Sequence, residues 1–218
     1  MNNLYIAHWS RLFAAGLCFM ALCACGSLPI AATPHTAFYS LQGARGAVPA
    51  AVATTFPADA PTLLINPPHA AAGFDSPRII YVRETHKLEY FAHSEWVDPP
   101  ARMLAPLLVA SLENAGAFRA VVLTPSSAAG DLRLDTEIIR LQHEFQSQPS
   151  RVRFTLRAYV VDDKTRRVLA WREFDAAVPA ASEDPYGGVV AANQAVQTVL
   201  ENLAAFCAEA ARSAQIEK

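Results

Sequence analysis

The chain has 218 residues, a formal net charge of −2 and a hydrophobic fraction of 52%. This length suits one domain with an additional segment, since domains commonly have about 100–200 residues. The near-neutral charge excludes nucleic acid as the main partner, because nucleic-acid-binding domains are strongly basic.

The N-terminal segment has the pattern of a bacterial lipoprotein signal peptide. A polar lead that ends at Arg11 precedes an apolar run over residues 12–22. This run has the length of a secretory signal and is shorter than the ~20 apolar residues that span a bilayer. The small residue Ala24 stands before Cys25, and a leucine stands three positions upstream of that cysteine, which resembles a lipobox. We predict that residues 1–24 are removed and that acyl chains are attached to Cys25.

Two alternatives stay open for this segment. Cys23 is a weaker attachment site, because Leu22 would occupy the position that requires a small side chain. The apolar character continues weakly to Ile30, which also fits a retained membrane anchor, but Pro29 interrupts a helix there. Two or more acyl chains hold a protein stably on a membrane, at about 0.8 kcal/mol per buried methylene. The lipoprotein hypothesis therefore predicts attachment without a spanning helix.

The composition after the signal predicts a tether followed by one domain. Residues 25–61 are rich in Ala, Pro, Thr and Gly and predict a tether, with a short strand near residues 37–41. Residues 62–214 carry regular periodicities and predict the folded domain. Cys207 is the one cysteine left in that domain, so no internal disulfide is expected. Its helical spacing from neighbouring apolar residues predicts a buried thiol.

The first half of the domain predicts three strands. Runs of β-forming residues at 62–66, 78–83 and 88–93 indicate these strands. The second and third are separated by the four residues 84–87, so we expect an antiparallel hairpin.

A helix is predicted directly after this hairpin. Asp98 is expected to cap its N-terminus and Pro99 to be its first residue. Pro106 removes a hydrogen bond inside the helix, which predicts a kink or a later start. Gly116 is expected to end it. The apolar face consists of Met103, Leu104, Leu107, Leu108 and Leu112.

The second half of the domain predicts four further strands. A short strand at 120–123 precedes a long one that starts at Leu132, in which apolar and charged residues alternate. The alternation changes phase at Ile138-Ile139, which predicts a β-bulge. Strands at 152–160 and 167–178 follow, joined by a tight turn.

A long amphipathic helix is predicted beyond Gly187-Gly188, since apolar residues then recur every three or four positions up to Ala210. The expected fold is α+β: a mostly antiparallel sheet with two main helices packed on one face, in two layers.

The sequence contains no motif of catalysis. The GxSxG, HExxH and CxxC patterns and a glycine-rich phosphate loop are all missing. The histidines that follow the predicted signal peptide are too scattered for a zinc site and are interpreted as surface residues. They are His35, His69, His86, His93 and His143. We therefore expect no catalytic residue, no metal and no cofactor.

Two charged groups have a functional and a structural interpretation. The pair Asp162-Asp163 resembles an acid/base pair, but its place in a hairpin favours turn formation. Arginines on one strand face would suit anionic lipid headgroups, yet cross-strand pairing with nearby acids is favoured. These arginines are Arg151, Arg153 and Arg157, and the acids are Asp135, Glu137 and Glu173.

Several motifs resemble the ABC-type transport auxiliary lipoprotein family. The family pattern has an Arg-led hydrophobic strand, a Tyr-rich strand, and a Trp followed by an acid and proline that open a helix. These features correspond to residues 78–83, 88–91 and 95–100. The family helix commonly ends with a Leu-x-x-x-Gly-x-Phe pattern, which matches Leu112, Gly116 and Phe118. With the lipobox and the early strand, the resemblance covers residues 38–212.

The resemblance implies a partner role and no enzymatic activity. Such lipoproteins accompany a membrane ATPase, a permease and a substrate-binding protein of the mammalian-cell-entry type, in systems that move lipids across the envelope. The paraquat-inducible operon lipoproteins are similar. The expected partners are this transport complex and, through Cys25, the membrane; a homo-oligomer stays open.

The residue after the attachment site predicts which of the two membranes holds the lipoprotein. An Asp at that position usually retains proteobacterial lipoproteins in the inner membrane, so Gly26 favours the periplasmic leaflet of the outer membrane. A structural envelope lipoprotein that assists outer-membrane assembly or cell-wall attachment stays open as the alternative, with a periplasmic hydrolase as a third class.

Overall fold

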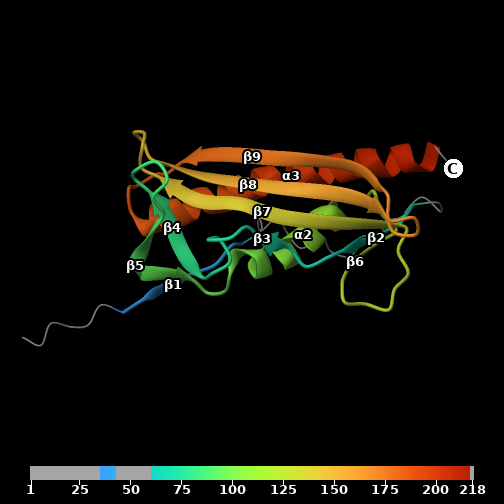
Figure 1. The fold of residues 1–218 in the computed structure, drawn as a ribbon, viewed down its shortest axis with the longest axis horizontal. Coiled ribbons are helices and arrows are strands. Elements are labelled where there is room, and N and C mark those ends of the chain that lie inside the picture. The colour runs from blue at the N-terminus through green and yellow to red at the C-terminus, as the bar shows by residue number, and fades with distance from the viewer. Residues whose placement is uncertain (1–34, 43–59, 217–218) are drawn as a thin grey trace, which may run out of the picture. The chain divides into compact units, whose positions relative to one another are not determined.

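The computed structural model describes residues 35–42 and 60–216 (Figure 1). The predicted signal peptide and Cys25 lie outside these residues. The described part of the chain contains nine strands and two helices. They are β1 (Ala37–Tyr39), β2 (Thr62–Ile65), β3 (His69–Ala70), β4 (Arg78–Val82), β5 (Glu89–Trp96), α2 (Pro100–Asn114), β6 (Ala120–Leu123), β7 (Leu132–Glu144), β8 (Arg151–Asp162), β9 (Val168–Pro179) and α3 (Pro185–Ile216).

The sheet is mixed, and β7 is its central strand. On one edge, β7 pairs with β8 in an antiparallel ladder, and β8 pairs in the same way with β9. On the other edge, β7 pairs in parallel with β2, β3 and β4 in turn. The parallel pairs β2–β6 and β1–β5 and the antiparallel hairpin β4–β5 complete the sheet.

The α+β class is therefore confirmed, but the expected predominance of antiparallel pairing is not, because five of the eight strand pairings are parallel. The antiparallel pairs join strands that are neighbours in sequence, where a turn reveals the pairing. The parallel pairs join segments that are far apart in sequence, so strand patterns alone do not reveal them.

The predicted β-bulge in β7 is present. The register between β7 and β8 shifts between Ile138 and Arg140, which leaves Ile139 as the extra residue. Before the bulge the even-numbered residues of β7 are buried, and after it the odd-numbered Leu141 and His143 are buried. The bulge thus keeps one face of β7 in the core although the sequence changes phase.

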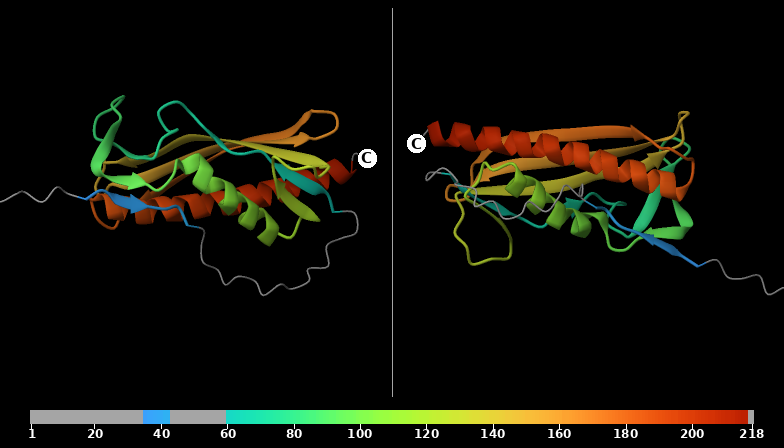
Figure 2. Two further views of the ribbon diagram at one scale, coloured as in Figure 1. Left: turned by 90° about the horizontal axis from the view of Figure 1, so that it is seen from below. Right: turned by 180° about the vertical axis from the view of Figure 1, so that it is seen from behind.

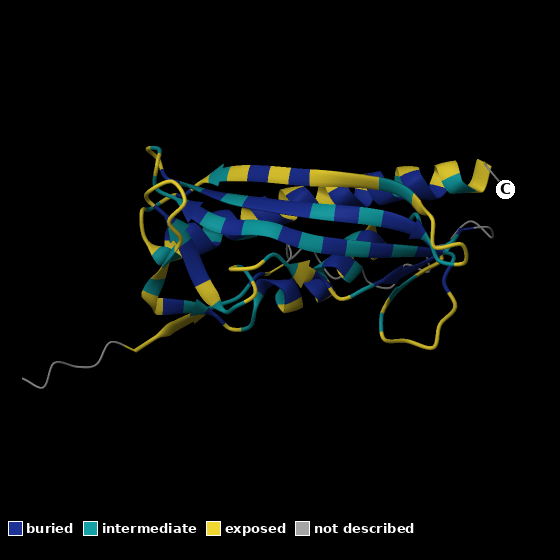
Figure 3. Cartoon of the chain, in the orientation of Figure 1, coloured by how far each residue is buried: buried dark blue, intermediate teal, exposed yellow. Residues whose placement is uncertain are grey.

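The two helices lie on the same side of the long strands β7, β8 and β9 (Figure 2). Helix α3 packs along β8 and β9, and α2 contacts α3, β6 and β3. Leu104, Leu108 and Leu112 of α2 and Phe154 and Leu156 of β8 are among the most deeply buried side chains. Along β7 and β8 buried residues alternate with intermediate ones, and β9 carries most of the exposed residues of the three long strands (Figure 3).

The start of α2 differs from the prediction. Its N-cap is Pro99 and its first residue is Pro100, with no side-chain cap. Asp98 instead accepts a hydrogen bond from Arg102 Nη1 at 2.9 Å, as an ion pair four residues apart. Two consecutive prolines fix the backbone for helix entry, so a side-chain cap is not required. The helix also continues through Pro106, so a later start was wrong, while Gly116 with φ +63° follows the helix end as expected.

Helix α3 begins earlier than predicted, at Pro185, so Gly187 and Gly188 lie inside its first turns. The Gly187 amide donates to Asp184 Oδ1 at 2.7 Å, and this hydrogen bond is the main cause of a lowered pKa of Asp184. A Cβ atom on Gly188 would lie 2.6 Å from Nδ1 of His143. The glycine is therefore required by close packing and does not mark a helix boundary.

Gly188→Ala tests this packing. In a helix, alanine is normally more stable than glycine by about 1 kcal/mol. Here we expect the opposite sign, a loss of about 1–3 kcal/mol in the free energy of unfolding, because the methyl group overlaps the imidazole. Urea titration measures the effect, and Gln194→Ala, at an exposed position of α3, is the control.

The same substitution in a His143→Ala background identifies the cause. The penalty of Gly188→Ala should shrink there, because the overlapping ring is gone. An unchanged penalty in that background would show that contact with His143 is not its origin.

Candidate functional site

The one site residue predicted from the sequence, Cys25, lies outside the described residues. The nearest described segment on its C-terminal side is 35–42, where the predicted tether enters the domain. Strand β1 in this segment pairs in parallel with the end of β5, with Phe38 opposite Glu95 and Tyr39 opposite Trp96. The strand predicted near residues 37–41 is therefore confirmed, and its partner is the strand that leads into α2.

Asn193 of α3 fastens the residues that follow β1. Its Oδ1 accepts a hydrogen bond from the Gln42 amide at 2.6 Å, and its Nδ2 donates to the Ser40 carbonyl at 3.3 Å. The same Nδ2 donates to the Val189 carbonyl of α3 at 2.9 Å, which holds the side chain in place. Leu41 is buried beside these contacts. The entry segment is thus fixed to the longest helix of the domain.

An uncharged hollow of about 520 Å³ lies between β1 and the N-terminal half of α3, and we name it the β1–α3 hollow. Phe38 and Tyr186 are 63% and 64% exposed and belong to its lining. The remaining lining residues are Tyr39, Ser40, Gln42, Val189, Val190, Asn193, Gln194 and Gln197. Aromatic and amide side chains without any charge make this surface suited to an apolar or neutral partner.

A second hollow, of about 520 Å³, follows the groove between α2 and α3. Leu107 of α2 and Val196, Leu200 and Ala204 of α3 supply most of its apolar wall. Gln42 and Gln197 line this groove and the β1–α3 hollow, so the two are adjacent.

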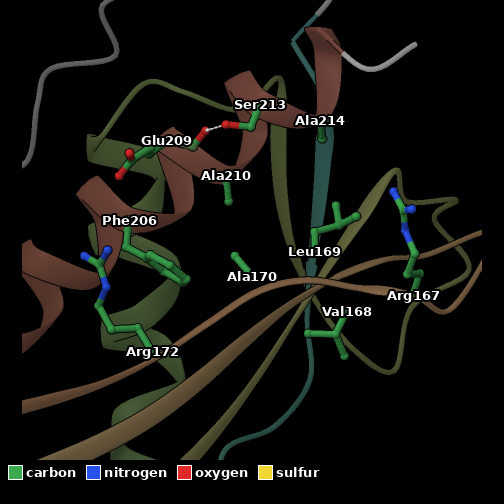
Figure 4. Close-up of a pocket in the computed structure, with 10 residues that line it drawn as sticks. All are labelled: Arg167, Val168, Leu169, Ala170, Arg172, Phe206, Glu209, Ala210, Ser213 and Ala214. Carbon is green, nitrogen blue, oxygen red and sulfur yellow. Dashed lines mark hydrogen bonds between the residues drawn. The ribbon is translucent and has the colours of Figure 1, made fainter.

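A third hollow, of about 530 Å³, separates the start of β9 from the C-terminal half of α3 (Figure 4). Arg167 lies at one end of this hollow and Arg172 at the other, and Leu169, Ala170 and Ala210 lie between them. The guanidinium of Arg172 stands 4.8 Å from the centroid of the Phe206 ring. In the described sheet β9 pairs with β8 alone, so it is an edge strand. A charged side chain directed inward on an edge strand, as Arg172 is here, disfavours the addition of another strand.

Arg153 and Arg157 of β8 form the cross-strand pairs favoured from the sequence, whereas Nε of Arg151 donates a hydrogen bond to Ser147 Oγ at 3.1 Å. Arg153 lies 3.0 Å from Glu144 and 2.5 Å from Asp175, and Arg157 lies 2.9 Å from Glu173 and 3.7 Å from Glu137. The structure thus adds two acids to the predicted set, and Asp135 accepts from Asn66 Nδ2 at 2.6 Å instead of pairing with an arginine.

The turn interpretation of Asp162-Asp163 is confirmed. Oδ1 of Asp162 accepts hydrogen bonds from the amides of Lys164 and Thr165 at 3.1 and 2.6 Å. Asp163 forms ion pairs with Arg133 and Arg166. Both carboxylates are therefore used for structure.

Of the five histidines that follow the predicted signal peptide, four are exposed as predicted, but His143 is buried and 2% exposed. Its Nε2 lies 2.8 Å from Ser150 Oγ, while Nδ1 has no hydrogen-bond partner among the described residues. Its ring packs 4.1 Å from the ring of Phe145, centroid to centroid. Burial lowers the pKa of His143, despite the opposing effect of Glu183 and Asp184. The phase change at the bulge in β7 was the signal that this position faces the core.

The buried histidine predicts a pH-dependent stability. Because the folded state lowers the pKa of His143, the unfolded chain binds a proton that the folded chain does not. The free energy of unfolding should therefore fall as the pH decreases through the ordinary value of 6.5. His143→Gln, whose amide can still bond Ser150, should flatten this dependence in urea titrations between about pH 7.5 and 5.5. His93→Gln at an exposed site is the control, and equal slopes in all three proteins would contradict the prediction.

Cys207 and the aromatic residues of the family motifs have structural positions. Cys207 is fully buried, and burial raises the pKa of its thiol to about 12, which confirms an unreactive position. Trp96 is 3% exposed and belongs to the core. Tyr90 is instead half exposed, with the guanidinium of Arg78 at 4.1 Å from its ring centroid.

Two absences concern the described residues. Within residues 35–42 and 60–216, no helix is both long and apolar enough to cross a membrane. Over the same ranges, no group of three or more His, Cys, Asp or Glu side chains is arranged to hold a metal ion.

Comparison with known proteins identifies the family. The family described as "ABC-type transport auxiliary lipoprotein component" matches residues 39–204, more than half of the chain. The chain belongs to this family. The matched residues extend from Tyr39, the last residue of β1, to Ala204 in α3, so they include β2 to β9, α2 and the first part of α3. Membership assigns the chain to the lipoproteins that assist ABC-type transport, and hence to the cell envelope.

Solved structures share the fold of this auxiliary lipoprotein. Protein XCC0632 from Xanthomonas campestris is 24% identical, with a TM-score of 0.71, and the match covers 83% of this chain and 99% of that one. A crystal structure of an uncharacterized protein is 12% identical with a TM-score of 0.62, covering 79% and 99%. At these identities the likeness shows the fold alone. None of the curated proteins compared matches the chain.

Proposed function

We propose that this protein is a membrane-anchored periplasmic auxiliary component of an ABC-type lipid transport system of the mammalian-cell-entry class, and that it acts by binding partners and not by catalysis. The observation that carries the proposal is the family match over residues 39–204. The proposal rejects a hydrolase because Asp162 and Asp163 are used in a turn and in ion pairs, and because Cys207 is buried in the core.

The attachment site in this proposal is Cys25. The domain is fastened to its entry segment by Asn193 and by the pairing of β1 with β5. An anchor at Cys25 would thus hold the whole domain, because a force applied at Ala37 would act on the sheet and on α3 together. Gly26 supports the outer membrane as the location.

Substitutions at the lipobox test the attachment and the location. Cys25→Ser should give either an unprocessed precursor or a soluble periplasmic protein, because no thiol remains for acylation. Gly26→Asp should move the protein from the outer to the inner membrane fraction. Density-gradient fractionation of membranes measures both. Retention in the outer membrane after full signal cleavage of the Cys25→Ser protein would refute the attachment site.

Co-purification tests the transport role. The protein extracted in detergent from native membranes should bring with it a permease, an ATPase and a mammalian-cell-entry protein. The structural envelope alternative predicts peptidoglycan or outer-membrane assembly proteins in the same fraction. Recovery of that second set without the transporter components would replace the proposal with the alternative.

A further inference from the structure

The end of the domain that receives the entry segment carries an exposed aromatic surface. Figure 1 shows β1 and the first turns of α3 at the same end of the domain, whereas the last turns of α3 lie at the other end. Phe38 of β1 and Tyr186 of α3 belong to the lining of the β1–α3 hollow, and each keeps more than half of its side chain in solvent. Strand β1 is coloured as exposed for most of its length in Figure 3.

The chemistry of this surface fits a membrane interface better than a charged ligand. None of the ten residues that line the hollow is charged. Tyr and Phe are side chains that occupy the boundary between headgroups and acyl chains, where an apolar ring is buried and polar groups remain wet. The outer face of β7, β8 and β9, in contrast, is covered by ion pairs.

The length of the chain before β1 limits how far this surface can be from the anchor. Ala37 lies 37 − 25 = 12 positions after Cys25. Twelve fully extended residues span at most about 40 Å, which is comparable to the size of a small domain. With acyl chains on Cys25, the entry end of the domain therefore stays within about 40 Å of the bilayer. Such confinement makes even weak insertion effectively intramolecular.

We propose that Phe38 and Tyr186 form a second membrane contact, which rests on the lipid surface and orients the anchored domain. This inference rests on the proposed attachment at Cys25. The surface takes neutral lipid, so its contact should depend little on salt or on the fraction of anionic lipid. The opposite end of the domain, with the third hollow and the exposed Trp171, would then face away from the bilayer.

Photocrosslinking from single positions tests the contact. The full acylated protein is placed in phosphatidylcholine vesicles, with p-benzoylphenylalanine at position 38 or 186. Position 171 serves as the matched control, because Trp171 is 62% exposed but lies on β9. Mass spectrometry should find lipid adducts at positions 38 and 186 at several times the yield at position 171. Equal yields, or adducts at none of the three positions, would overturn the proposal.

A charge at one ring should weaken the contact of the other. Phe38→Asp should reduce the lipid adduct formed from position 186, because a carboxylate opposes insertion. Val168→Asp, at an exposed apolar residue of β9, should leave that yield unchanged. An unaffected yield in the Phe38→Asp protein would show that the two rings do not act as one surface.

The same preparation separates this inference from the proposed function. The mass of the processed protein reports whether Cys25 is acylated. A protein without acyl chains fails the proposed attachment, whereas an acylated protein without lipid adducts at position 38 or 186 fails the orientation alone. In intact cells, adducts at these positions to a second copy, to a transporter protein or to a glycan in place of lipid would overturn the membrane contact.

Discussion

Strand β7 holds the sheet together, because both of its edges are paired and the segments on the two edges come from different parts of the chain. One edge forms a continuous antiparallel ladder with β8. The other edge pairs in succession with β2, β3 and β4, each over only two or three residues. Such short parallel pairs are weak on their own. Their stability depends on a common partner long enough to reach all of them.

The bulge in β7 makes this arrangement compatible with a single core. A strand whose inward phase was uninterrupted would turn either Ile138 or Leu141 toward solvent. With Ile139 as the extra residue, both side chains stay buried, and His143 follows them into the core. The ring of His143 then limits how closely α3 can approach, and only a glycine at position 188 permits the observed contact. The placement of α3 on the sheet is thus coupled to the bulge.

Helix α3 in turn connects the core to the entry segment and to the hollow beside it. Its buried face packs on β8 and β9, while Asn193 bonds the segment that enters from the predicted tether. The uncharged hollow beside this bond and the apolar groove between α2 and α3 share Gln42 and Gln197. In a family of transport auxiliary lipoproteins, such surfaces indicate the function better than reactive side chains do. The carboxylate pair that resembled an acid/base pair in the sequence is used in a turn and in ion pairs, and the thiol of Cys207 is buried as predicted.

Local patterns in the sequence determined both described helices and every described strand except the two-residue β3. They also determined the bulge, the family motifs and Cys25 as the expected attachment site, because turn residues, periodicity and a lipobox are signals between near neighbours. The sequence also indicated the pairs of β4 with β5 and of β8 with β9, since a short turn joins the strands of each pair. Only the tertiary structure decided the parallel pairs on β7, the burial of His143 against Gly188 and the placement of Phe38 and Tyr186 in the lining of one hollow. These arise between segments distant in the chain, where packing, and not local propensity, selects the partner.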